Sequence, residues 1–423
     1  MRNRGLVVTA AGVGLNLALG VLYAWSIFGK QFTEAIENGG FGWTKTAATL
    51  PYTIAIACFA LMMVPAGRLQ DRFGPRIVAT SGALLTGMGL IITSYASAQN
   101  TLPALLGFGL LCGTGFGLGY ASATPAAVKW FPPEKKGLIT GLVVSGFGLA
   151  PVYIAPLSKY LLSTYGLNSS FMILGFSFSV LTIIFAQFIN NPAAPVAAHK
   201  SAAAKAAMTD YSFREMLRDP RFYMLYLEYA CAATAGLMII GHLAKIVAVQ
   251  SANMVTIGFL LVALLAIFNA VGRIVAGIIS DYIGRVVTLS IVFVLQAIVM
   301  FFFSQFNSEA TFIAGAALVG FNYGACLSLF PATTADYWGT KNLGLNYGIL
   351  FTAWGVGGVF GPILAGRIAD MTGSYALAFN IAGSLLIFAS VLTFLTFAGI
   401  GEKSNEANGP QEETKQLFET EET

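Results

Sequence analysis

The sequence has few charged and few reactive side chains. Only 10% of its 423 residues are charged and only two are histidine, whereas an average soluble domain carries roughly 25% charge. So few polar groups cannot cover a soluble chain of this length, which excludes an ordinary soluble enzyme. The four cysteines stand far apart within apolar runs, where neither a disulfide nor a zinc site has close neighbours, so we interpret them as packing residues. They are Cys58, Cys112, Cys231 and Cys326.

The sequence also lacks motifs for binding nucleic acid, for catalysis within a membrane and for binding phosphate. The formal net charge is only +4 and no arginine-rich block alternates with aromatic residues, so nucleic acid is excluded as a partner. No cluster of His, Asp and Glu and no Ser/His pair lies within the apolar runs, which disfavours a membrane enzyme. The glycine-dense segments lack the Lys-Ser/Thr ending of a phosphate loop. We expect no cofactor and no metal, and no obligate protein partner is evident.

Long hydrophobic runs are what the sequence has instead. Hydrophobic residues make up 56% of the chain, together with 47 glycines, and the runs do not alternate as barrel strands do. A membrane-spanning helix needs about 20 apolar residues. Twelve such segments lie at roughly 6–29, 45–67, 75–98, 102–126, 137–160, 168–190, 222–248, 253–279, 286–305, 309–333, 344–367 and 375–398. The predicted fold class is an all-α membrane protein with twelve transmembrane helices in a lipid bilayer.

One long connection divides the spans into six and six. It covers 191–221 and is rich in alanine and proline before it turns basic. We expect six-helix bundles over 1–190 and 222–400, with a cytoplasmic linker between them. The acidic residues 401–423 contain almost nothing apolar and should form a disordered cytoplasmic tail. Most Lys and Arg near span ends fall on the side of both termini, which predicts cytoplasmic termini, and the short loops suit a bacterial inner membrane.

A loop motif occurs twice, 210 residues apart. It follows the second and the eighth span, with the pattern G-x-x-x-D-R-x-G-x-R in the first copy. Gly67 allows helices to approach closely, Asp71 can accept from a helix N-terminus or an arginine, and Gly74 allows a tight reversal. Such a latch would hold one face of a two-state transporter closed. The candidate latch residues are Gly67, Asp71, Arg72, Gly74, Arg76, Asp281 and Arg285.

The motif recurs at the matching place of the second half, which favours the latch over simple anchoring of the loop by its positive charges. Three glycines at 137, 141 and 148 are also repeated, 207 residues later, at 344, 348 and 355. Both repeats indicate duplicated halves.

The loop motif, with its weaker second copy, resembles that of the major facilitator superfamily, and the likeness covers nearly the whole chain. Two further stretches are similar to the oxalate/formate antiporter branch and to the monocarboxylate transporters. They read LYAWSIF at 22–28 and WFPPEKKGLITG at 130–141. The resemblance implies two pseudo-symmetric six-helix bundles that carry an organic anion, as in a bacterial lactate transporter.

Arg273 is the only basic residue well inside a span. A charge at the bilayer centre costs at least about 2.5 kcal/mol on insertion scales, so it should face a watery cavity and meet an anion. Its guanidinium fork matches the two oxygens of a carboxylate. A salt bridge to a buried acid is the alternative, and Glu228 is the only acid placed in another span. Asn269, on the same helix face, could bind the substrate or simply join helices.

Departures from the related families narrow the substrate. Many monocarboxylate transporters carry an aspartate where Asn269 stands and a lysine in the first span, which is missing here, so the resemblance leaves the proton site open. Oxalate carriers use a second basic residue in the eleventh span, but 346–364 contains none. One arginine suits one carboxylate, which favours a monocarboxylate over a dicarboxylate.

Proton coupling has three possible sources. His242 is the one histidine within a span and is either a gate or proton residue or a core histidine. Glu228 is a second candidate, unless it pairs with a basic loop residue. Arg273 alone could also link proton and substrate. Four aromatic residues could line the substrate cavity or serve only for packing, and they are Tyr120, Tyr323, Phe351 and Trp354.

These residues together predict a secondary active transporter and not an enzyme. It would move a small monocarboxylate of the L-lactate or pyruvate type with a proton by alternating access. One rival is an oxalate/formate-like exchanger, for which counterflow would greatly exceed net uptake. The other is a membrane sensor that binds a carboxylate without moving it.

Overall fold

The computed structural model describes residues 2–192, 210–252, 254–255 and 257–395. In the first half the elements are α1 (Arg2–Leu19), η1 (Gly20–Ala24), α2 (Trp25–Thr33), η2 (Ile36–Asn38), α3 (Lys45–Phe73), α4 (Pro75–Thr93), α5 (Leu102–Ala104), η3 (Leu105–Cys112), α6 (Gly113–Val128), η4 (Pro133–Lys135) and α7 (Lys136–Phe188). In the second half they are α9 (Phe213–Met216), α10 (Pro220–Gln250), α11 (Gly258–Ile283), α12 (Arg285–Phe303), α13 (Glu309–Trp338), α14 (Leu343–Thr372) and a final helix, Ala376–Leu395.

Eleven helices of the described residues are long and apolar enough to cross a membrane. One of them, α7, is 53 residues long and leaves helical backbone at Gly166, where φ is 75° and ψ is −179°. It therefore contains two of the expected spans, 137–160 and 168–190, and the eleven helices supply twelve crossings. The predicted all-helical membrane fold is confirmed. The expected tail, 401–423, and most of the linker lie outside the described residues.

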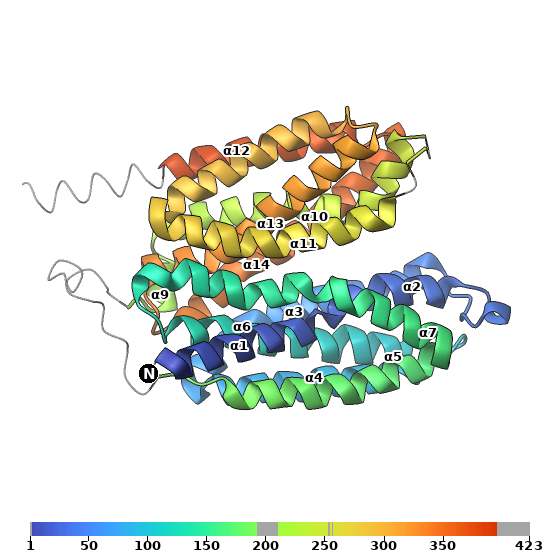
Figure 1. The fold of residues 1–423 in the computed structure, drawn as a ribbon, viewed down its shortest axis with the longest axis horizontal. Coiled ribbons are helices and arrows are strands. Elements are labelled where there is room, and N and C mark those ends of the chain that lie inside the picture. The colour runs from blue at the N-terminus through green and yellow to red at the C-terminus, as the bar shows by residue number, and fades with distance from the viewer. Residues whose placement is uncertain (1, 193–209, 253, 256, 396–423) are drawn as a thin grey trace, which may run out of the picture.

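The helices form two bundles, which Figure 1 shows one above the other. Helices α1, α3, α4, α6 and α7 pack in one bundle, while α10 to α14 and the final helix form the other. The bundles meet mainly through α7 with α11 and α3 with α14, and α7 also contacts α13. We call the end that carries Gly74, Gly284 and the N-terminus the linker end. In Figure 1 the bundles lie close together there and diverge toward the opposite end.

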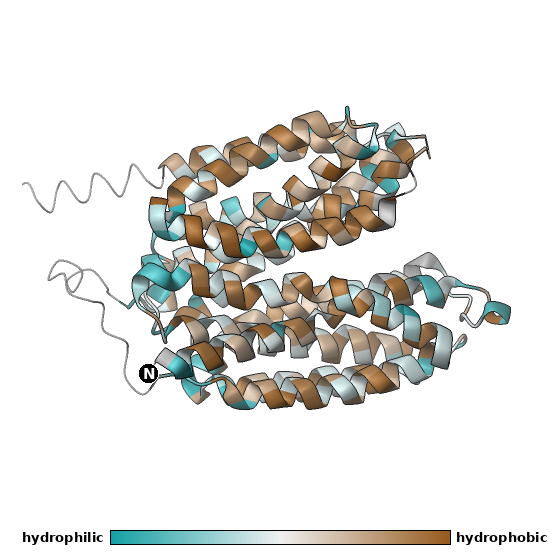
Figure 2. Ribbon diagram, in the orientation of Figure 1, coloured by the Kyte–Doolittle hydropathy of each residue, from teal (hydrophilic) through white to brown (hydrophobic). Residues whose placement is uncertain are grey.

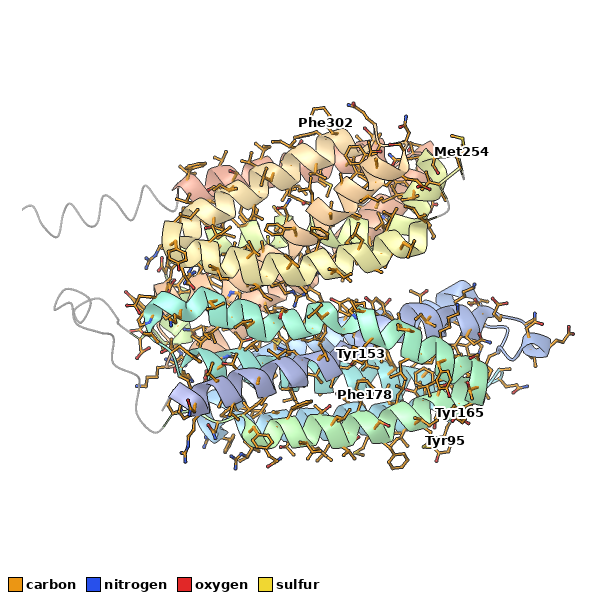
Figure 3. The ribbon with its side chains drawn as sticks, viewed as in Figure 1. Tyr95, Tyr153, Tyr165, Phe178, Met254 and Phe302 are labelled. Atoms are coloured by element: carbon orange, nitrogen blue, oxygen red, sulfur yellow. The ribbon has the colours of Figure 1, made fainter. Side chains whose placement is uncertain are left out.

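The outer surface is suited to lipid. Figure 2 shows hydrophobic residues along the outer sides of the helices and hydrophilic residues mainly near their ends. Large apolar side chains such as Leu61 and Phe176 are exposed there, as a hydrocarbon environment requires. At the end opposite the linker, Tyr95 and Tyr165 point outward (Figure 3). Aromatic residues take such places at membrane interfaces.

The repeat is visible in the backbone. Helix α3 ends at Gly74 with φ 88° and ψ 157°, and α11 ends at Gly284 with φ 90° and ψ 156°. This left-handed φ strains any residue with a β-carbon. The two turns stand 210 residues apart, so each position of α3 has a counterpart on α11.

Candidate functional site

Arg273 lies on α11 at the contact between the bundles and is fully buried. One amino group donates to the carbonyl oxygen of Val144 on α7, and Nε donates to Oδ1 of Asn269 at 2.8 Å. The second amino group, Nη2, has no hydrogen-bond partner among the described residues. None of the ion pairs in the described part of the chain includes Arg273, so a salt bridge to a buried acid is not found. A buried guanidinium with an open donor favours an anionic ligand.

Phenol groups from both bundles lie within electrostatic range of this guanidinium. They are Tyr23, which is also within hydrogen-bonding reach, Tyr120, Tyr323 and Tyr347. The first two belong to the N-terminal bundle and the last two to the C-terminal bundle. Both bundles therefore bring hydroxyl groups near the charge, and these can donate to or accept from a small polar guest.

The aromatic candidates of α14 join the same cluster. Trp354 donates from Nε1 to the Tyr323 hydroxyl at 2.7 Å, and its ring stacks on Phe351 with centroids 4.9 Å apart. Phe59 of α3 packs against both rings across the bundle contact, at 5.7 Å and 5.5 Å. Tyr120 lies 5.5 Å from Phe351. The structure thus brings all four aromatic candidates together near the arginine.

The N-terminal bundle presents apolar side chains where the C-terminal bundle presents polar ones. Met63 stands 210 residues before Arg273, and Phe59 stands 210 residues before Asn269. A β-carbon on Gly141 would lie 2.2 Å from the carbonyl oxygen of Arg273, and one on Gly348 would lie 2.3 Å from that of Met63. The two residues therefore hold equivalent positions, both buried. At these matched positions the site is polar on one side and apolar on the other.

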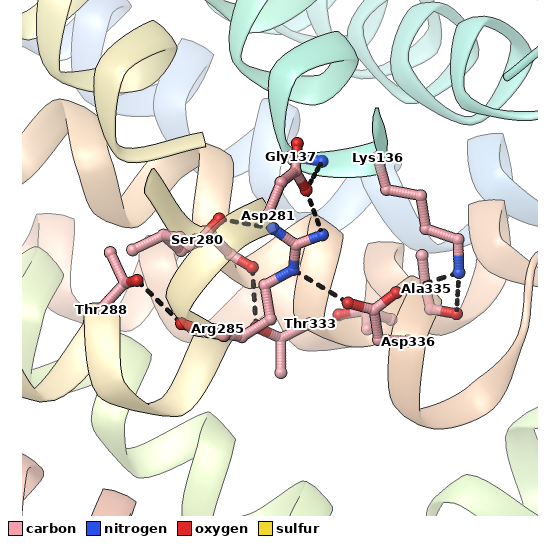
Figure 4. Close-up of polar contacts among 12 residues, drawn as sticks. Lys136, Gly137, Ser280, Asp281, Arg285, Thr288, Thr333, Ala335 and Asp336 are labelled. Carbon is pink, nitrogen blue, oxygen red and sulfur yellow. Dashed lines mark hydrogen bonds and ion pairs between the residues drawn. The ribbon is translucent and has the colours of Figure 1, made fainter. Parts of the chain in front are cut away.

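Asp281, at the end of α11, joins the bundles at the linker end (Figure 4). It accepts hydrogen bonds from the backbone N–H groups of Gly137 and Leu138 at 2.9 Å each. Arg285 pairs with Asp281 at 2.7 Å and donates from Nε to Asp336 at 2.9 Å. A carboxylate on free N–H groups in the first turn of a helix is well placed, because those donors have no partner within the helix.

Asp71 makes the related contact at the second junction. It accepts from the N–H of Leu345 in the first turn of α14 at 3.0 Å, and the amino group of Lys129 lies 3.7 Å away. A β-carbon on Gly67 would lie 2.0 Å from the carbonyl oxygen of Gly344, so this approach requires glycine. Each bundle thus holds the first turn of a helix in the other.

Some candidates lie outside both sites. Arg72 and Arg76 are exposed, the former over the ring of Phe73 at 5.1 Å, and in the described part of the chain neither bonds to the opposite bundle. His242 is half-buried, and its Nε2 lies 3.1 Å from the carbonyl oxygen of Pro362 in its own bundle.

Glu228 is buried, and the alternative to a proton role, a pair with a basic loop residue, is not found among the described residues. Its side chain is 1% exposed, and neither oxygen has a hydrogen-bond partner among the described residues. No ion pair found in the described ranges contains it.

Sequence reasoning missed several residues of these sites. Tyr347 precedes Phe351 by four positions, so helical spacing alone would have placed both on one face. Tyr23 stands within the stretch 22–28 that carries the family resemblance. Lys136 and Asp336 pair at 3.0 Å, but they stand 200 residues apart and no local signal joins them.

Comparison with known proteins places the chain among transporters. The family model described as Major Facilitator Superfamily matches residues 5–260 and 230–421. The chain is 30% identical to the uncharacterized MFS-type transporter YhjX of Escherichia coli, over 81% of this chain and 83% of that protein. It is 28% identical to the oxalate:formate antiporter of Oxalobacter formigenes (94% and 90%) and 24% identical to monocarboxylate transporter 13 of Bos taurus (91% and 87%). The fold is similar to that of the E. coli fucose:proton symporter, with a TM-score of 0.70 at 13% identity over 93% of this chain and 99% of that one.

Proposed function

The chain belongs to the Major Facilitator Superfamily, and we propose that it carries a small monocarboxylate of the L-lactate or pyruvate type together with a proton. The open amino group of Arg273 is the observation that carries the substrate class. Val144 and Asn269 occupy other donors of the guanidinium and hold its plane in place. A carboxylate oxygen that accepts from Nη2 completes the hydrogen bonds of the guanidinium. It also neutralises a charge whose burial in the membrane costs free energy.

The asymmetry of the site supports one carboxylate and not two. The carboxylate lies against Arg273, and the short apolar end of the substrate points toward Met63 and Phe59, which hold the mirrored positions. The phenols of Tyr120 and Tyr323 are available to the hydroxyl or keto oxygen of such an acid. A dicarboxylate would bring its second charge against buried apolar side chains, which is unfavourable.

The two inter-bundle junctions act as the gate. Asp71 and Asp281 hold the linker end closed, and both contacts must break before the bundles separate there. Substrate binding neutralises Arg273 and so lowers the cost of passing through a fully closed state. In a bacterial inner membrane with cytoplasmic termini, the linker end is the cytoplasmic face.

A carboxylate exchanger is the second candidate. It is favoured by the 28% identity to the oxalate:formate antiporter over 94% of this chain. Exchange would need no proton, because the returning anion would reorient the carrier.

Uptake into proteoliposomes separates the two functions. Vesicles containing the purified protein receive radiolabelled L-lactate with an inward proton gradient that is either imposed or collapsed. Proton-coupled transport predicts accumulation that requires the gradient and that unlabelled pyruvate competes away. Uptake that instead requires oxalate or formate inside the vesicles, and ignores the gradient, would select the exchanger.

A further inference from the structure

The C-terminal bundle contains buried polar groups around Glu228 that the proposed site does not use. Glu228 is on α10, and the polar groups within electrostatic range of it are Cys231 on the same helix, Cys326 and Tyr337 on α13, and Thr393 on the final helix. In the described part of the chain none of the groups facing it is basic. An ionised carboxylate without a partner is costly in such surroundings, so this conformation holds the neutral acid.

The surroundings accommodate the acid proton. The Thr393 hydroxyl donates its hydrogen to the carbonyl oxygen of Ala389 at 2.9 Å. Its oxygen keeps a lone pair that can accept from a protonated carboxyl nearby.

A small cavity lies between the surroundings of Glu228 and the arginine site. It has a volume of about 10 Å³ and is lined by Cys326, which lies within electrostatic range of Glu228, and by Tyr323, which lies within electrostatic range of Arg273. Its wall also contains Gln296 and Asn322, whose amides bond to each other at 3.0 Å.

This cavity has the partners that a buried water requires. Oδ1 of Asn322 and Nε2 of Gln296 have no hydrogen-bond partner among the described residues. One acceptor and one donor beside a space of about one water molecule match the needs of an ordered internal water. Such a water would extend a polar path from Tyr323 toward Glu228.

Glu228 and Arg273 lie at similar depths from the linker end, so the same gate separates both from that side. Glu228 stands eight residues from the start of α10 and Arg273 ten residues from the end of α11, which is about 12 Å and about 15 Å from the linker end at 1.5 Å per residue. Opening of that end would hydrate both side chains, so the carboxyl could ionise there as the substrate leaves.

We propose that Glu228 carries the co-transported proton and that the Gln296–Asn322 cavity holds a water linking it to the substrate site. The proton binds a carboxyl oxygen of Glu228 when the substrate anion binds beside Arg273, and both are released when the linker end opens. This inference rests on the proposed function. His242, half-buried and bonded to Pro362, is not part of this path.

The variant Glu228→Gln tests the proposal, because glutamine keeps the shape of the neutral acid and cannot release a proton. Two assays are compared in proteoliposomes: exchange of labelled for unlabelled L-lactate at equal pH, and accumulation driven by an inward proton gradient. We expect Glu228→Gln to exchange within about threefold of the unmodified protein and to lose accumulation, which reflects loss of coupling without loss of substrate binding. Exchange should also lose its dependence on pH. His242→Gln and Glu309→Gln, the latter at an exposed acid, serve as controls that keep both activities.

Three results would overturn the proposal. Full gradient-driven accumulation by Glu228→Gln would show that the proton travels elsewhere, and loss of accumulation in His242→Gln would transfer the role to the histidine. Loss of both activities in a folded Glu228→Gln protein would make the residue structural. Absence of L-lactate exchange in the unmodified protein would instead reject the underlying transport function, and with it this inference.

Discussion

The contact of Asp281 with the first turn of α7 should control how often the linker end opens. Asp281 accepts two backbone hydrogen bonds at 2.9 Å and an ion pair at 2.7 Å, and its side chain is only 7% exposed. The ion pair with Arg285 lies within the C-terminal bundle and is kept when the bundles separate. The change Asp281→Asn keeps one acceptor and loses one of the two bonds across the junction. At about 2 kcal/mol for a hydrogen bond to a charged group, the closed state is weakened roughly 30-fold relative to the open linker end.

The Asp71 junction provides a comparison for this shift. Asp71 accepts one bond across the junction, from the N–H of Leu345 at 3.0 Å, while Gln70 at 3.2 Å and Lys129 at 3.7 Å lie in its own bundle. Asparagine keeps an oxygen for the Leu345 bond and loses only the charge, so Asp71→Asn should cost about 1 kcal/mol and shift the equilibrium only about fivefold.

Spin labels at two exposed positions of the linker end measure this shift. Arg76 lies in the first turn of α4 in one bundle and Val287 in the first turn of α12 in the other, so their separation reports opening. Pulsed electron paramagnetic resonance should show one short distance in the unmodified background and a large longer-distance population in Asp281→Asn. Glu309→Gln should change nothing. An unchanged distribution in Asp281→Asn, or a larger effect of Asp71→Asn, would refute this reasoning.

Three further results are expected. Met63→Lys places a cation opposite the arginine and should raise oxalate uptake relative to lactate about tenfold if the new ion pair contributes about 1.4 kcal/mol; an unchanged ratio in competition assays would count against the mirrored site. Trp354→Phe removes the donor to Tyr323 and should raise the KM for L-lactate about fivefold at about 1 kcal/mol for a neutral hydrogen bond. Burial would raise the pKa of Asp219, but hydrogen bonds from Arg221 outweigh it and hold that pKa below its usual range. Its stabilisation is thus present above the unfolded value of about 3.9 and is lost as pH falls through the folded pKa, so Asp219→Asn should abolish this acid-dependent loss in thermal unfolding in detergent.

The membrane fold could be predicted from sequence because a bilayer imposes length and apolarity on each span. The tight reversal at Gly74 could also be predicted, because the left-handed φ of such a turn favours glycine. The bend at Gly166 within one continuous helix was not, because the two expected spans were separated by an assumed loop.

The candidate site could be predicted only in part. Arg273 was evident because an isolated charge in a span needs a partner. Contacts across the bundles, such as that of Asp281 with Gly137, depend on how the two halves dock. The position of the Tyr23 phenol near Arg273 could not be predicted, because aromatic residues are common in membrane helices. The Lys136–Asp336 pair could not be predicted either, because the two residues stand 200 positions apart in the sequence.

Binding of L-lactate to Arg273 is the central claim, and calorimetry on the detergent-purified protein tests it most directly. Arg273→Gln removes the charge and the open donor, while Arg273→Lys keeps the charge without the fork. Because removing one partner of a buried charge pair costs at least about 2 kcal/mol, we predict that Arg273→Gln weakens binding roughly 30-fold or more, with Arg273→Lys in between. Lys159→Gln, at an exposed lysine of α7, should bind normally. Equal affinity of Arg273→Gln and the unmodified protein would contradict the account.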